Sequence, residues 1–128
     1  MKQLLPEGWP RPSGYSNGII ADGVQVFVAG MIGWDEKGDF PDSFSGQVEQ
    51  ALRNTIAVLA EADAGPQHIV RMTWYVTDLD AYRKNLKGVG AAWREVIGKN
   101  FPAMAVVGVT ELVEPAAMVE IESTAVLD

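Results

Sequence analysis

The sequence has 128 residues, of which 48% are hydrophobic and 21% charged, so we treat residues 1–128 as one globular domain with a single core. The formal charge is −7 and the Lys and Arg residues are scattered singly, which argues against a nucleic-acid partner. Without cysteine there are no disulfides, thiolate nucleophiles or Cys-ligated metals. No apolar run approaches the roughly 20 residues that span a bilayer, so we expect a cytoplasmic protein with no membrane partner.

The N-terminal part predicts an irregular entry followed by two strands. Proline and glycine are frequent in residues 1–14, which favours an extended, irregular segment. Strands are expected over residues 15–20 and 24–29, joined as a hairpin by the turn at residues 21–23. Two glycines surround an apolar pair at residues 30–33. This pattern predicts a kink or bulge where the backbone comes close to another group.

The middle of the chain predicts two helices separated by a strand. Ser43 or Ser45 can cap a helix that runs to residues 60–62, and a strand is expected over residues 69–76. Asp78 or Asp80 can cap a second helix that ends at Gly98. Each helix carries apolar residues at helical spacing: Val48, Leu52, Ile56 and Leu59 on the first, and Leu86, Val89, Trp93 and Ile97 on the second.

The C-terminal run predicts two further strands, patterned differently and joined as a hairpin at residues 114–115. Residues 103–109 are apolar or small on both faces, with Met104 and Val106 sharing one face. Residues 118–126 alternate, so that Glu120, Glu122 and Thr124 oppose an apolar row. The complete order predicts an α+β sheet with two helices packed on one face. Partner chains are expected to cover the other face, where we place Met104 and Val106.

A small set of side chains carries candidate chemistry. Glu120 and Glu122 share one strand face, where a carboxylate can act as a general base on water, although a solvated strand face gives the same pattern. Tyr15 is either a phenol donor to a ligand or an amphipathic residue at a sheet edge. Trp34 is either a pocket wall or a loop anchor. His68 is the only histidine and no carboxylates have metal spacing, so we expect no metal and no cofactor.

These segments together resemble the RidA/YjgF family over residues 15–126. The resemblance rests on six stretches in order: Tyr15-Ser16-Asn17-Gly18, Val26 to Ile32, Gln47 to Asn54, Tyr75-Val76-Thr77-Asp78, Phe101-Pro102-Ala103 and Val119-Glu120-Ile121-Glu122. Such proteins are small trimers that include imine and enamine deaminases. The resemblance therefore implies a chorismate-mutase-like fold, three chains around a barrel, and ligand pockets at the subunit interfaces.

The resemblance also implies roles for individual residues. It makes Tyr15 and Glu120 the catalytic pair, and it places the backbone of Gly30 and Met31 against the substrate. We add the side chains of Met31, Trp34, Met104 and Val106 as pocket walls.

One position departs from the hydrolytic members of the family. They have an arginine after Phe-Pro-Ala, which grips the substrate carboxylate, and this chain has Met104. A thioether supplies neither charge nor donors, which argues against 2-iminopropanoate and 2-iminobutanoate and for a more apolar substrate. Arg71, or an arginine of another chain, is a candidate replacement. The alternative function is a non-catalytic trimer that binds a small ligand or regulates a partner. The endoribonuclease activity sometimes assigned to the family fits the acidic charge least.

Overall fold

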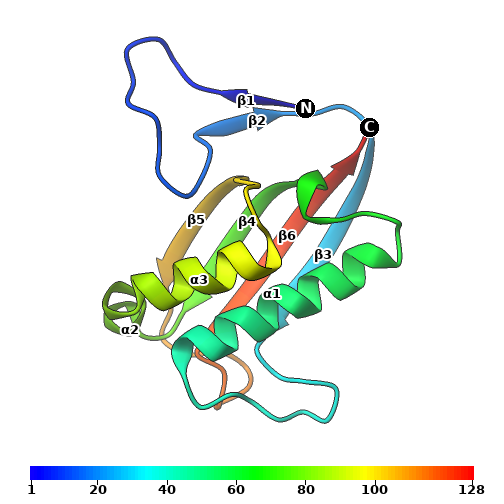
Figure 1. Cartoon of the computed structure of the whole chain (residues 1–128). Helices are drawn as coiled ribbons and strands as arrows, with labels where there is room; N and C mark the ends of the chain where they lie inside the picture. The colour runs from blue at the N-terminus through cyan, green and yellow to red at the C-terminus, as the bar shows by residue number, and fades with distance from the viewer.

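The computed structural model describes residues 1–128 as a mixed sheet with helices on one face (Figure 1). The main sheet has four strands in the order β3-β6-β4-β5, and a separate pair, β1-β2, stands at the N-terminal end. The strands are β1 (Lys2–Leu4), β2 (Gly18–Ile20), β3 (Val24–Ile32), β4 (Ile69–Val76), β5 (Ala103–Gly108) and β6 (Val119–Leu127). The helices are α1 (Phe44–Ala60), the 3-10 turn η1 (Pro66–His68), α2 (Leu79–Lys84) and α3 (Leu86–Val96). None of them has the length and apolarity that crossing a membrane requires.

The α+β class is confirmed, but both predicted hairpins are wrong. β2 pairs with β1, in a segment expected to be irregular, and β3 pairs with β6. β5 does not pair with β6. It runs parallel to β4, because α2 and α3 form a crossover connection between the two strands. The turn glycine Gly23 has φ 146°, and a side chain there would overlap the Leu127 carbonyl. Its role is therefore close approach to the end of β6.

Helix α1 begins and packs as the sequence predicts. The Ser43 hydroxyl accepts a hydrogen bond from the Gly46 N–H at 3.0 Å, which caps the first turn. Val48, Leu52 and Leu59 are fully buried against the sheet. The helix expected between Asp78 and Gly98 is instead two helices, because Asn85, with φ −119° and ψ 24°, leaves the helical conformation between α2 and α3.

The sheet has one face under the helices and one open face. Val119, Ile121 and Ala125 of β6 are fully buried under the helices, while Glu120 and Glu122 lie on the open face, as the alternation predicts. The open face has no helix over it and carries exposed apolar side chains at both edges of the sheet, notably Phe27 and Val107.

The placement of Met104 and Val106 on the open face is wrong. They are register partners of Met72 and Trp74, both fully buried, and residues paired in this way share a face. Met104 and Val106 are half-buried and pack against the core on the helix side. The open face of β5 is formed by its small residues and Val107. Alternation separates the two faces of a strand, but only the pairing with β4 decides which one the helices cover.

Candidate functional site

A cleft of about 900 Å³ lies between α3 and the edge strand β5. Its size falls within the usual range for small-molecule sites. The inner wall contains the rings of Trp74 and Trp93, whose centroids are 6.1 Å apart, and Met104 and Val106 line the β5 side. Both rings are buried, together with their unpaired indole N–H groups, so a ligand would meet mainly the half-buried side chains of Phe101, Met104 and Val106. The cleft therefore suits a ligand with a hydrocarbon body.

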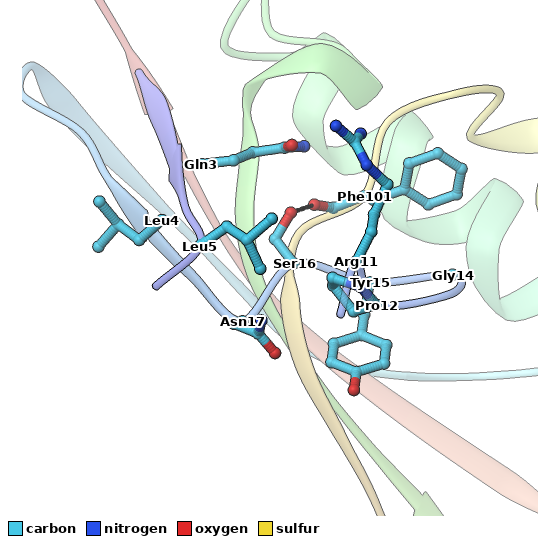
Figure 2. A pocket seen from close by; sticks show the side chains of 10 residues that line it. All are labelled: Gln3, Leu4, Leu5, Arg11, Pro12, Gly14, Tyr15, Ser16, Asn17 and Phe101. Carbon is cyan, nitrogen blue, oxygen red and sulfur yellow. Dashed lines mark hydrogen bonds between the residues drawn. The ribbon is translucent and has the colours of Figure 1, made fainter. Parts of the chain in front are cut away.

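Tyr15 stands at the rim of this cleft because its neighbour Ser16 is tied to the start of β5. The Ser16 N–H donates to the Pro102 carbonyl at 3.0 Å, and the buried Ser16 hydroxyl donates to the Phe101 carbonyl (Figure 2). Tyr15 remains 42% exposed, and in the figure its ring extends away from Gln3. A second hollow, of about 420 Å³, lies between the N-terminal segment, including Gln3, and Phe101. Tyr15 borders both spaces.

Glu120 lies on the open face of the sheet, beside a bulge in β3. The pairing of β3 with β6 shifts between Val28 and Met31, which confirms the irregularity expected around Gly30. A methyl group at Gly30 would overlap the Glu120 carboxylate and would lie 2.7 Å from its Cδ atom. The side chain that lies against the Gly30 backbone is thus that of Glu120, the candidate base. Glycine at position 30 lets the half-buried carboxylate lie flat across β3.

The second carboxylate of the strand, Glu122, is engaged within the chain. Its Oε1 atom accepts a hydrogen bond from the Tyr75 hydroxyl at 2.5 Å. This hydrogen bond is the main cause that raises the pKa of Tyr75, with desolvation and the nearby carboxylates adding to it. Arg71 lies on the same open face and borders a hollow with Glu122. Glu120 makes no comparable side-chain hydrogen bond within the chain.

Two tyrosines make a testable contribution to pH dependence. Desolvation by burial raises the pKa of Tyr82, and Glu122 raises that of Tyr75, both above 10.0. The folded chain therefore holds these protons more tightly than the unfolded chain does. The resulting stability is present below the ordinary tyrosine pKa and is lost as the pH rises through the folded pKa. Titration of tyrosinate absorbance should show that Tyr75→Phe and Tyr82→Phe each remove a late step, whereas loss of an early step would contradict this.

The structure separates the predicted site residues into groups. Tyr15, Met104 and Val106 line the cleft on the helix side, while Glu120 and Gly30 meet on the open face. Of the other two predicted residues, Met31 packs against the core, and Trp34 is exposed with its ring 6.0 Å from that of Phe40. Arg71 is on the open face, so within one chain it does not reach the cleft beside Met104.

Sequence reasoning missed the contribution of α3 to the cleft. Gly90, Trp93 and Arg94 of α3 line it, and so does Lys99, which follows the helix. A signal was present, because Leu86, Gly90 and Arg94 recur every fourth residue and so lie on one side of a helix, next to the apolar stripe. We expected this helix only to cover the sheet.

The chain has a chorismate-mutase-like α+β fold with a cleft of small-molecule size. Residues 10–127 match the family model described as Endoribonuclease L-PSP. A RutC family protein of Aquifex aeolicus is 34% identical over 128 residues, covering 98% of this chain and 99% of the relative. The chain thus belongs to the RidA/YjgF family.

Solved structures agree with this assignment. A Rid-family protein of unknown function from Yersinia pestis superposes with a TM-score of 0.85 at 28% identity, with 98% of both chains covered. The TdcF protein of E. coli, solved with bound serine, gives a TM-score of 0.73 at 25% identity, with both chains covered completely.

Proposed function

We propose that this chain hydrolyses imines or enamines with an apolar side group, as a homotrimer in which two chains build each site. The observation that carries the proposal is the position of Glu120 and Gly30 on the open face, opposite the cleft of the same chain. A single chain therefore has a base without a cleft and a cleft without a base. A neighbouring chain that covers the open face would also bury exposed Phe27 and Val107.

The chemistry asks little of the protein beyond positioning and proton transfer. The Glu120 carboxylate accepts a proton from water while the water oxygen bonds to the carbon of the protonated C=N group. The π electrons move to nitrogen. Proton transfer from the new hydroxyl to nitrogen then lets ammonia leave as the carbonyl forms, and Glu120 returns its proton to the departing ammonia. Tyr15, at the rim of the cleft, is placed to donate a hydrogen bond to the substrate.

The cleft favours a bulky substrate over the smallest imino acids. Met104 offers a thioether where a hydrolytic relative has a charged donor, and Val106 and Trp93 add further apolar surface. The serine held by E. coli TdcF supports an amino-acid-sized ligand for this fold. A methyl side group would leave most of this cleft unfilled, so 2-iminopropanoate should be a poor substrate.

Met104 favours a second candidate function, a non-catalytic trimer that binds a small apolar ligand. In that case Glu120 would be a side chain of the open face and would not activate water. Cleavage of RNA, the activity in the description of the matching family model, is opposed by the formal charge of −7. Incubation with structured and unstructured RNA tests that activity directly.

Mixed trimers test the proposed two-chain site. Glu120→Gln removes the base, and Val106→Phe obstructs the cleft, so each variant alone should hydrolyse the imine of leucine poorly. When the two are unfolded together and reassembled, about a quarter of the interfaces should join an intact cleft to an intact Glu120. Activity should therefore return in the mixture, and light scattering should report a trimer. A mixture no more active than its components would show that the two-chain site is wrong.

A further inference from the structure

We propose that Arg94 supplies the carboxylate contact that Met104 cannot make, so that the cleft selects carboxylates carrying a large hydrocarbon group. The inference deepens the proposed function and rests on it for the reaction. The binding event itself is independent of hydrolysis. Its basis is the position of one guanidinium, the absence of an acidic partner for it, and the composition of the cleft around it.

The Arg94 side chain folds back along α3 towards the cleft. Arg94 stands in the last turn of the helix, and Gly90 lies one turn earlier on the same side; both line the cleft with Met104. A Cβ atom at Gly90 would lie 3.4 Å from Nη1 of Arg94, so the guanidinium rests over the bare backbone of Gly90. Any longer side chain at position 90 would compete for this space. Gly90 thus keeps a place for the guanidinium at the edge of the cleft.

No acidic group of the chain neutralises this arginine. The adjacent Glu95 is directed to Arg53 of α1, with 3.9 Å between the charged atoms, and Arg94 forms no ion pair. Lys99, which lines the same cleft, forms none either. The lining contains no Asp or Glu, although the chain has 17 acidic and 10 basic residues. Two unpaired cations therefore border a largely apolar space in an acidic protein.

This combination defines the ligand class. A guanidinium binds a carboxylate through two parallel hydrogen bonds, which a methionine cannot offer. An exposed ion pair alone contributes little to affinity, so a short carboxylate should bind weakly. A hydrocarbon group that packs against the half-buried Phe101, Met104 and Val106 adds apolar burial to the ion pair. We therefore infer carboxylates with aromatic or branched hydrocarbon groups, such as the 2-imino acids of large apolar amino acids.

Calorimetry with stable probes separates the charge from the hydrocarbon. The probes are 3-phenylpropanoate, its neutral amide and propanoate, added to the assembled protein. We expect 3-phenylpropanoate to bind about tenfold more tightly than the amide, and propanoate to bind too weakly to measure. Arg94→Gln should remove the tenfold preference while leaving amide binding unchanged. Arg83→Gln, a matched change at an exposed arginine paired with Asp80 outside the cleft, should leave all three affinities unchanged.

Two results would overturn the inference: equal binding of the carboxylate and the amide by the unmodified protein, or a preference that survives Arg94→Gln. Met104→Arg provides a check in the opposite direction, since it should create measurable propanoate binding. The same experiments with Glu120→Gln distinguish failure here from failure of the proposed function. That variant should bind 3-phenylpropanoate normally and hydrolyse imines about 100-fold more slowly. If it hydrolyses imines as well as the unmodified protein, the role of Glu120 fails while the carboxylate site stands.

Discussion

Replacing Gln47 with leucine is expected to lower the free energy of unfolding by about 3 kcal/mol, because three partly buried hydrogen bonds from its side chain to the backbone are lost. Gln47 is 2% exposed. Its Nε2 group donates to the carbonyls of Pro41 and Ala116 at 3.2 and 3.0 Å, and its Oε1 accepts from the Met118 N–H at 2.8 Å. Leucine has a similar volume but no polar atoms. The loop before α1 and the loop before β6 would both lose the hydrogen bonds that anchor them to the helix.

Urea denaturation at a fixed chain concentration measures this loss, since any oligomer makes stability depend on concentration. For a domain of this size the melting temperature should fall by roughly 10 °C. Gln67→Leu is the matched control, because Gln67 is exposed and makes no side-chain hydrogen bond to another residue. A Gln47→Leu protein as stable as that control would show that water replaces the lost contacts at little cost.

Glu120→Gln is expected to reduce hydrolysis of a leucine-derived imine about 100-fold, the usual size of a lost general base. The amide keeps the shape of the side chain but accepts no proton from water. Glu122→Gln, on the same face of β6, should change the rate by only a small factor, because Glu122 is engaged by Tyr75. The measurement is release of the carbonyl product from an imine generated in the cuvette.

A third variant separates proton transfer from a general effect of charge. Gly30→Ala keeps the carboxylate but displaces it from the β3 backbone, where a Cβ atom would overlap it. Its rate should fall towards that of Glu120→Gln while the protein remains folded. If Glu120→Gln and Glu122→Gln both keep the rate of the unmodified protein, neither carboxylate activates water, which would favour the non-catalytic alternative.

Local sequence patterns predicted most helices and strands of this chain, but they did not predict which strands pair with each other. The strand expected over residues 69–76 is β4, Ser43 caps α1, and the bulge falls beside Gly30. Each of these depends on neighbours in the sequence. The two hairpins were wrong because a turn signal says that the chain bends, and leaves open which strand it then meets. The order β4, helix, β5 did carry a signal for a parallel pair.

The candidate site was predicted in part, for a related reason. The pattern placed Glu120 on one face of β6, and the glycines marked the backbone that approaches it. It left open which face of β5 the helices cover, so Met104 was placed on the wrong side. Arg94 and Lys99, the cations that line the cleft, were missed for a different reason. Arg94 acts through its position one turn after Gly90, and that geometry appears only when α3 is set against β5.

The position of β6 constrains the order in which this molecule can form. β6 follows every other element in the chain, yet it lies inside the sheet, where it is the only partner of β3 and one of two partners of β4. Until residues 119–127 have been synthesised, the four-stranded sheet cannot assemble. Most of its pairing joins strands far apart in the sequence, which slows folding. During synthesis, β3 and the apolar side of α1 therefore stay exposed until β6 is available. In this period the chain is most prone to aggregate and most dependent on chaperones.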